Sequence, residues 1–218
     1  MKVLELFCGT KSISKAFEKA GHETFTVDND PQHSPDLCIN ILEFEINDLP
    51  KEWRKPEVIW ASPPCTTFSV ASIGIYWDAS KPKSWKTYIG LAIAKKTIEI
   101  IHELKPKYYF IENPRGMLRK QYFMESIFKK TVSYCKYGAK VQKPTDIWTN
   151  AHHWITKQRC SPGDSCHESA KRGSDRGIQY LGGAVKRGII PDLLCEEIVK
   201  VCEGKQKIKQ EILQLCEG

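Results

Sequence analysis

The stretch from Lys2 to Asp28, KVLELFCGTKSISKAFEKAGHETFTVD, decides the fold class. It begins with a short apolar run, KVLELF (2–7), which leads into a glycine turn and is typical of a buried strand. The next segment, SISKAFEKAG (12–21), has apolar residues three and four apart and ends on a glycine, which predicts an amphipathic helix. A second strand, ETFTVDND (23–30), follows. Strand, helix and strand in this order predict a parallel βαβ unit.

The same alternation continues along the chain. EVIWASPP (57–64) and KYYFIENP (107–114) are typical of strands, whereas LAIAKKTIEIIHEL (91–104) and PDLLCEEIVKVCE (191–203) have helical spacing. The sequence therefore predicts an α/β fold with a doubly wound, mostly parallel sheet. Ligands in such sheets bind beyond the carboxyl ends of the strands, where the segments CGTKS, VDND, SPPC and ENP fall.

The composition limits the classes of protein to which this chain can belong. The 218 residues are 41% hydrophobic and 27% charged, and no apolar run reaches the roughly 18 residues that would span a bilayer. The opening MKVLELFCG does not have the form of a signal peptide, so we expect a cytoplasmic protein with no membrane segment. Nine cysteines in a reducing compartment indicate thiols, metal ligands or nucleophiles. A net charge of +7 fits a polyanionic partner.

Gly9 and Asp28 together indicate a cofactor site. A glycine turn between a strand and a helix lets backbone N–H groups approach a polar ligand, although a simple tight turn would have the same sequence. A carboxylate about 20 residues further on is placed to bind ribose hydroxyls, which favours a cofactor that contains a nucleoside.

Cys65 and Glu112 are candidate reactive groups. Cys65 follows Pro63 and Pro64 at the end of a strand, and the prolines would hold the thiol at a fixed angle. A buried, unreactive cysteine is the alternative. Glu112 ends an apolar strand, where a carboxylate is costly unless it is paired or takes part in chemistry such as proton donation near neutrality.

Six segments, taken in order, resemble the cytosine-5 methyltransferases that act on DNA, with small phage or bacterial members the most similar. They cover the chain from about residue 2 to about residue 203: LELFCGTKS (4–12), VDND (27–30), SPPCTTFS (62–69), ENP (112–114), YGAKVQKPTDIW (137–148) and RGIIPDLLCEEI (187–198). The resemblance implies a Rossmann-like fold, DNA methylation as in restriction–modification, and a cytosine flipped out of double-stranded DNA. It leaves restriction protection, phage DNA masking and regulation open as roles.

The resemblance also implies individual residue roles. Cys65 would add to carbon 6 of cytosine, and Glu112 would bind ring nitrogen 3, while Ser69, Asn113, Lys140 and Lys143 would contact the substrate. The methyl donor, S-adenosylmethionine, would be bound by Phe7, Cys8, Gly9, Thr10, Ser12, Asp28, Asn29, Asn40, Ile41 and Pro64. The segment 71–85 resembles a mobile loop that closes over the base.

One departure from the family keeps other functions open. Two arginines of the family align with Pro144 and Asp146, and Lys136, Lys140 or Lys143 would have to substitute for them. A catalytically degenerate DNA-binding relative is therefore an alternative. A tRNA cytosine-5 methyltransferase is another, which the small inserted lobe and the basic charge permit.

The chain is expected to divide into a catalytic core (1–150), a small inserted target-recognition lobe (151–178) and a C-terminal segment that returns to the core (179–218). The end of the C-terminal segment is expected to form a charged surface helix. A lobe this short would read few bases, so a partner protein is a possible aid. Cys160, Cys166 and His167, with His152 or His153, are candidate zinc ligands, and incidental thiols in a polar loop are the alternative. The lobe's basic residues suit phosphate contacts: Lys157, Arg159, Lys171, Arg172 and Arg176.

Overall fold

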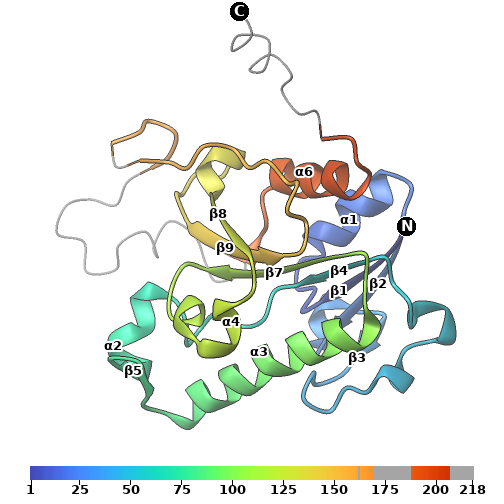
Figure 1. Ribbon diagram of the computed structural model, residues 1–218, viewed down its shortest axis with the longest axis horizontal. Helices are drawn as coiled ribbons and strands as arrows, with labels where there is room; N and C mark the ends of the chain where they lie inside the picture. Colours follow the sequence, from blue (N-terminus) through green and yellow to red (C-terminus); the bar gives the residue numbers. More distant parts are fainter. Residues whose placement is uncertain (162, 169–187, 207–218) are drawn as a thin grey trace, which may run out of the picture.

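A seven-stranded sheet forms the centre of the molecule (Figure 1). The computed structural model describes residues 1–161, 163–168 and 188–206. The strand order is β3-β2-β1-β4-β7-β9-β8, and β9 alone runs antiparallel to its two neighbours. This confirms the predicted doubly wound, mostly parallel sheet. The strands are β1 (Lys2–Leu6), β2 (Glu23–Asp28), β3 (Leu37–Cys38), β4 (Val58–Ala61), β7 (Tyr108–Pro114), β8 (Lys129–Ser133) and β9 (Pro144–Thr149).

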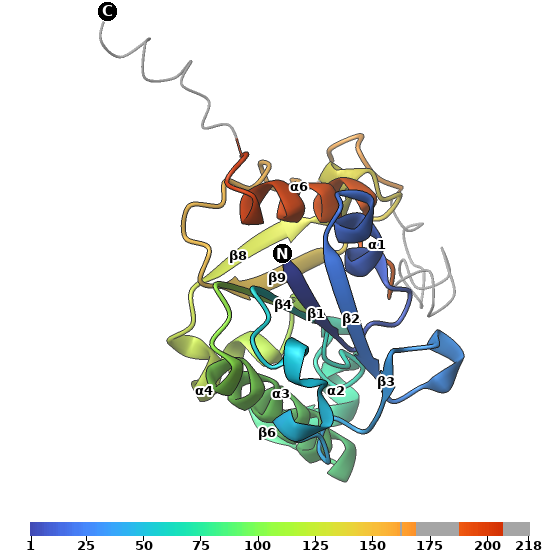
Figure 2. The same ribbon diagram turned by 90° about the vertical axis from the view of Figure 1, so that its right-hand side faces the viewer.

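Helices cover both faces of this sheet (Figures 1 and 2). Helices α1 (Ser12–Lys19) and α6 (Asp192–Cys202) lie on one face. Helices α3 (Trp85–Leu104) and α4 (Tyr122–Glu125) lie on the other. Short 3-10 helices lie in the connections: η1 (Pro31–His33), η2 (Ile46–Asp48), η3 (Lys51–Trp53), η4 (Val70–Ser72), η5 (Leu118–Lys120) and η6 (Tyr134–Tyr137).

Burial of the sheet on both faces explains the near-continuous apolar runs of its strands. Successive side chains of a strand point to opposite faces. Leu4, Leu6 and Ile59 belong to the core cluster that also holds Ile100 and Ile101 of α3. Val3, Val58 and Trp60 belong to a second cluster with residues of α1 and α6, namely Ile13, Phe17, Leu194 and Ile198.

Two segments differ from the expectations. Helix α3 begins at Trp85 rather than Leu91, because the Ser84 hydroxyl caps it by accepting a hydrogen bond from the N–H of Thr87 at 3.4 Å. The segment 71–85, expected to be a loop, contains α2 (Ile73–Tyr76) and a hairpin of β5 (Trp77–Asp78) and β6 (Lys81–Pro82). Its closure over a base stays a prediction.

The topology places the expected sites together. The chain passes from β1 outward to β2 and β3 and then returns to β4 on the other side of β1. The carboxyl ends of β1 and β4 therefore flank the point where the strand order reverses, which is where such sheets bind ligands. Among the described residues, no helix is long and apolar enough to cross a membrane. The expectations for residues 169–187 and 207–218, including Lys171, Arg172, Arg176 and the C-terminal helix, lie outside the described residues.

Candidate active site

The turn after β1 has an unusual backbone. Phe7 and Gly9 have positive φ angles of 59° and 47°, which turn the chain sharply at the end of the strand. The N–H of Gly9 donates to Oδ2 of Asp28 at 2.9 Å, and the N–H of Cys8 donates to the carbonyl of Val27 at 3.2 Å. The structure therefore brings the two predicted parts of the cofactor site, the Gly9 turn and Asp28, into direct contact.

The other residues expected to bind the cofactor lie in several segments of the chain. The hydroxyls of Thr10 and Ser12 lie 2.9 Å apart and line a pocket of about 360 Å³ that extends between α1 and α6. Pro64 lines a second pocket of about 250 Å³ beside α3. Asn29 is exposed and follows Asp28. Asn40 and the buried Ile41 lie in the loop after β3, where Oδ1 of Asn40 accepts a hydrogen bond from the N–H of Leu42 at 3.1 Å. Their roles toward a cofactor stay predictions.

Two cysteines lie after neighbouring strands, and their surroundings differ. Cys8 is buried, and its burial together with the Asp28 carboxylate raises the pKa of its thiol to about 12. Such a thiol stays protonated near neutral pH and is a poor nucleophile. Cys65 is only partly buried. Of these two, Cys65 is the better candidate for a nucleophile.

Cys65 begins a tight turn that contacts the segment after β7. Its carbonyl accepts hydrogen bonds from the N–H groups of Phe68 and Ser69 at 3.0 and 3.1 Å. The carbonyl of Phe68 accepts from the N–H of Met117 at 2.7 Å. A Cβ atom at Gly116 would lie 2.0 Å from that same Phe68 oxygen, so this close approach requires glycine. Sequence reasoning missed Gly116.

Glu112 is buried and contacts Tyr134 and Lys143. Only 6% of its surface is exposed. The hydroxyl of Tyr134 donates to Oε1 of Glu112 at 2.8 Å, and Nζ of Lys143 lies 3.7 Å from the same oxygen. Burial and the nearby Glu112 carboxylate raise the pKa of Tyr134, so its hydroxyl keeps the proton that it donates. Sequence reasoning missed Tyr134; its only signal was a tyrosine within a hydrophobic segment.

A hydrogen bond connects the Glu112 strand to the Cys65 turn. Asn113 is fully buried, and its Nδ2 donates to the carbonyl of Pro63 at 2.9 Å. Of the other residues expected to contact the substrate, Ser69 has its hydroxyl 3.1 Å from that of Ser72, and Lys140 is exposed. Contacts of these three with a substrate stay predictions.

The two positions where the resemblance leads us to expect arginines have other uses in this chain. Pro144 is the first residue of β9. Asp146 is fully buried and accepts hydrogen bonds from Arg119, whose Nε lies 2.7 Å from Oδ2. The hydroxyl of Thr131 donates to Oδ1 of Asp146 at 2.7 Å. Asp146 is thus a paired structural carboxylate, and Lys143 is the cation beside Glu112.

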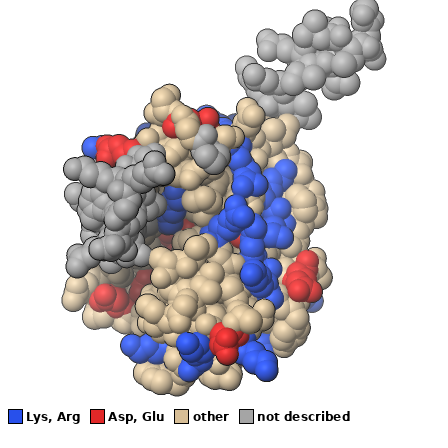
Figure 3. Space-filling model, turned by 90° about the vertical axis from the view of Figure 1, so that its left-hand side faces the viewer, with Lys and Arg blue, Asp and Glu red and all other residues tan. Residues whose placement is uncertain are grey.

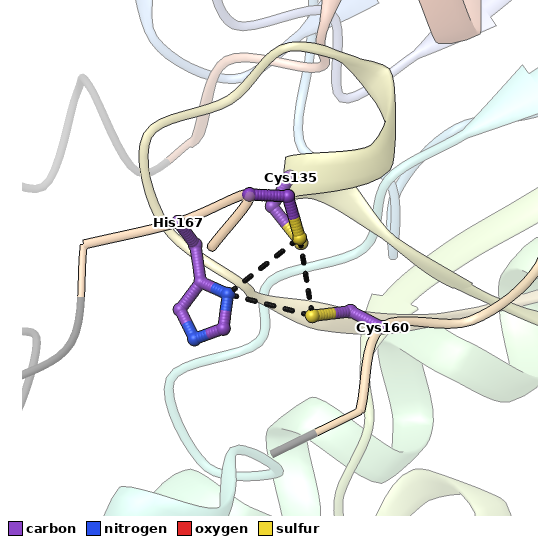
Figure 4. A group of neighbouring side chains, drawn as sticks. Cys135, Cys160 and His167 are labelled. Atoms are coloured by element: carbon purple, nitrogen blue, oxygen red, sulfur yellow. Dashed lines mark hydrogen bonds between the residues drawn. The ribbon is translucent and has the colours of Figure 1, made fainter. Parts of the chain in front are cut away.

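The three residues expected to bind zinc lie close together in the structure, and a fourth residue lies beside them. Cys160, Cys166 and His167 form a cluster with Cys135, and their ligand atoms all lie within 4.8 Å of one another (Figure 4). Cys135 lies in η6, and sequence reasoning missed it because it is distant in the sequence.

The expectation that His152 or His153 completes this cluster was wrong. Both histidines are exposed, and each ring packs on an aromatic ring elsewhere. The ring centroid of His152 lies 4.6 Å from that of Phe128, and that of His153 lies 5.6 Å from that of Tyr108.

Comparisons with known proteins agree with the family resemblance found in the sequence. A family model for C-5 cytosine-specific DNA methylases matches residues 1–142. A probable DNA (cytosine-5)-methyltransferase of Frog virus 3 (isolate Goorha) is 30% identical over 222 residues, which cover 93% of this chain and 100% of that protein. Type II methyltransferase M.FnuDI of Fusobacterium nucleatum is 27% identical over 127 residues, which cover 56% of this chain and 34% of that protein.

Among solved structures, Entamoeba histolytica methyltransferase EhMeth aligns with a TM-score of 0.47 and 16% identity, over 68% of this chain and 52% of that one. This chain thus spans the whole of the viral relative, about a third of the bacterial one and about half of the solved structure. Because the family model matches more than half of the chain, and the viral relative matches nearly all of it, this chain belongs to the C-5 cytosine-specific DNA methylase family.

Proposed function

We propose that this chain transfers a methyl group from S-adenosylmethionine to carbon 5 of cytosine in double-stranded DNA, through a covalent bond between Cys65 and the base. The observation that carries the proposal is the hydrogen bond between Asn113 and Pro63. It ties the strand that bears Glu112 to the segment that directly precedes Cys65, so that the nucleophile and the acid lie on segments that are bonded to each other.

The chemistry follows from these two side chains. The Cys65 thiolate forms a bond to carbon 6 of the ring, and the protonated form of Glu112 donates its proton to ring nitrogen 3, where the electron pair arrives. Tyr134 and Lys143 then stabilise the carboxylate that this transfer leaves on Glu112. S-adenosylmethionine supplies the electrophilic methyl group that carbon 5 attacks. Loss of the carbon 5 proton and release of Cys65 then restore the aromatic ring.

The residues around the first turn fit such a cofactor. The positive φ angle of Gly9 and the carboxylate of Asp28 form a polar turn of the kind that accommodates a nucleoside. Pro64, which directly precedes Cys65, lines the pocket beside α3.

Charge supports a nucleic-acid substrate. The chain has a net charge of +7, and Figure 3 shows Lys and Arg side chains gathered in a band across one face of the molecule. Such a band suits phosphate contacts.

The cytosine must leave the DNA double helix for Cys65 to reach it, so we propose that the base is flipped. The proposal includes residues 151–178 as a small target-recognition lobe, with a partner protein supplying further base contacts. The zinc ion expected in this lobe has a candidate site of its own in the four-residue cluster around Cys160.

The test is methyl transfer from labelled S-adenosylmethionine to duplex DNA or to tRNA. We expect label in DNA, and DNA with 5-fluorocytosine in the target should form a covalent adduct that Cys65→Ala abolishes. Transfer to tRNA alone would refute the DNA assignment, and an adduct that persists in Cys65→Ala would refute the role of Cys65. Bisulfite sequencing of DNA from cells that express the chain would then give the target.

A further inference from the structure

The four-residue cluster joins two segments that are distant along the chain. Cys135 lies in η6, whereas Cys160, Cys166 and His167 lie close together in the sequence after β9. Figure 4 shows the labelled side chains of Cys135, Cys160 and His167 pointing toward one another. The sulfurs of Cys160 and Cys166 lie 3.3 Å apart, and those of Cys166 and Cys135 lie 3.6 Å apart.

The imidazole completes the group. Nδ1 of His167 lies 3.4 Å from the sulfur of Cys160 and 3.8 Å from that of Cys166. Tetrahedral Zn²⁺ with bonds of about 2.3 Å to sulfur and about 2.0–2.1 Å to nitrogen would separate two sulfurs by about 3.8 Å, and a sulfur from the nitrogen by about 3.6 Å. The observed spacings are close to these values, so one ion fits at the centre with small movements of the thiols.

The type of ligand selects the metal. Three thiolates and one imidazole form a Cys₃His set, which is a frequent structural zinc site and leaves no open position for a substrate. Calcium and magnesium prefer oxygen ligands, and the cluster offers none. A disulfide between Cys160 and Cys166 is the competing arrangement, but it would leave the convergence of Cys135 and His167 on the same point unexplained.

The surroundings hold the ligand segments in place. The N–H of Cys160 donates to the hydroxyl of Ser133 at 3.1 Å, which attaches the lobe to the end of β8. Asp164, between two of the ligands, pairs with Lys136 at 2.8 Å and accepts a hydrogen bond from the N–H of Ser161 at 3.0 Å. Lys136 is the residue after Cys135, so this ion pair joins the same two segments as the cluster does.

We propose that Cys135, Cys160, Cys166 and His167 bind one structural Zn²⁺ ion, which fastens the last three of these residues to η6. The site is separate from the methyl-transfer chemistry. It nevertheless bears on the active site, because Cys135 directly follows Tyr134, whose hydroxyl bonds Glu112. The ion therefore fixes the inserted lobe against the segment that supports the catalytic acid.

The first test is metal content. The full chain, purified under reducing conditions without chelator, should contain about one zinc per chain by elemental mass spectrometry. Cys135→Ser and His167→Ala should each lower Zn²⁺ affinity by more than about 100-fold, since loss of an outer partner alone typically costs 10- to 100-fold. A folded wild-type chain that neither contains zinc nor binds added ZnCl₂ would overturn the proposal. So would a Cys160–Cys166 disulfide that persists in the wild-type chain under the same reducing conditions.

Matched variants separate this site from folding and from catalysis. His167→Cys should keep the metal, because four thiolates also bind zinc. Addition of Co²⁺ to the metal-free chain should give a thiolate-to-cobalt charge-transfer band that Cys135→Ser lacks. Cys38→Ser, which removes an exposed thiol elsewhere, and Cys65→Ala should both keep their zinc. Loss of zinc in Cys38→Ser equal to that in Cys135→Ser would overturn the assignment, whereas a failed methyl-transfer assay with zinc retained would count against the proposed function only.

Discussion

The hydrogen bond from Tyr134 to Glu112 gives the sharpest prediction for the proposed reaction. Tyr134→Phe removes only a hydroxyl that is 2.8 Å from Oε1 of Glu112 in a buried site. Hydrogen bonds to charged groups contribute about 1.5–3 kcal/mol, and each 1.4 kcal/mol changes a rate about tenfold. We therefore expect kcat for DNA methylation to fall by about 10- to 150-fold.

The split between kcat and KM tests the reasoning behind this number. Tyr134 bonds the enzyme's own carboxylate, so KM for DNA and for the methyl donor should change little. Single-turnover methylation with labelled donor measures the chemical step, and the rate of adduct formation with 5-fluorocytosine DNA reports the step that Glu112 assists.

Tyr137→Phe is the matched control. Tyr137 lies in the same short helix, is equally buried, and donates its hydroxyl to Glu197 at 2.9 Å, away from Glu112. The control should lose stability to a similar extent in urea unfolding and keep its kcat. Equal losses of kcat in both variants, or a kcat within twofold of wild type for Tyr134→Phe, would refute a positioning role for Tyr134.

Three further predictions concern the turn, the cation and a buried acid. Gly116→Ala should destabilise the chain by about 3 kcal/mol and slow adduct formation, because the new Cβ would lie 2.0 Å from the carbonyl oxygen of Phe68; urea unfolding measures the first effect. Lys143→Met should reduce kcat at least tenfold and Lys143→Arg much less, since only the first removes the cation beside Glu112. Burial raises the pKa of Glu5 from 4.5 to about 7. The folded state thus binds this proton more tightly, and stability should fall by up to about 3 kcal/mol as pH rises from 4.5 to 7, as measured by urea midpoints; Glu5→Gln should remove that slope.

Each of these has an outcome that would contradict it. Gly74→Ala is the control for the glycine variant, because a Cβ there would meet nothing within 4 Å, and equal destabilisation of the two would remove the steric argument. Equal activity of the Met and Arg variants at Lys143 would show that no cation is needed. A Glu5→Gln chain whose stability still falls over the same pH range would place the titrating group elsewhere.

Sequence reasoning predicted the parts of the molecule that depend on local order. The apolar runs and helical spacing predicted strands β1, β2, β4 and β7 and the helices α1 and α6 to within a few residues. The ends of parallel strands meet at one edge, so the pairing of Gly9 with Asp28 followed from the pattern as well. Predicting these features requires only residues that are close in the sequence and the direction of the strands.

The missed residues depend on contacts between distant segments. Tyr134 and Cys135 are adjacent, yet one bonds Glu112 and the other faces Cys166, and nothing in the spacing of YCKYG predicts either contact. Gly116 is required only because the Phe68 carbonyl passes close to it. The contacts of Tyr134 and Cys135 depend on the addition of β8 and β9 to the sheet, with β9 antiparallel to both its neighbours, which the strand-and-helix pattern did not indicate.

The register of β9 explains how the chain can lack the two arginines that the resemblance leads us to expect and still place a cation beside Glu112. Glu112 lies opposite Ile147, and Asn113 lies opposite Asp146, so Asp146 shares the face of Asn113 rather than that of Glu112. On that face Asp146 binds the guanidinium of Arg119, which comes from the connection after β7. Lys143 comes just before β9, has a positive φ angle of 29°, and brings its ammonium group to 3.7 Å from Glu112. The departure from the family pattern therefore argues for a rearranged site rather than a degenerate one, and the comparison of Lys143→Met with Lys143→Arg decides between the two.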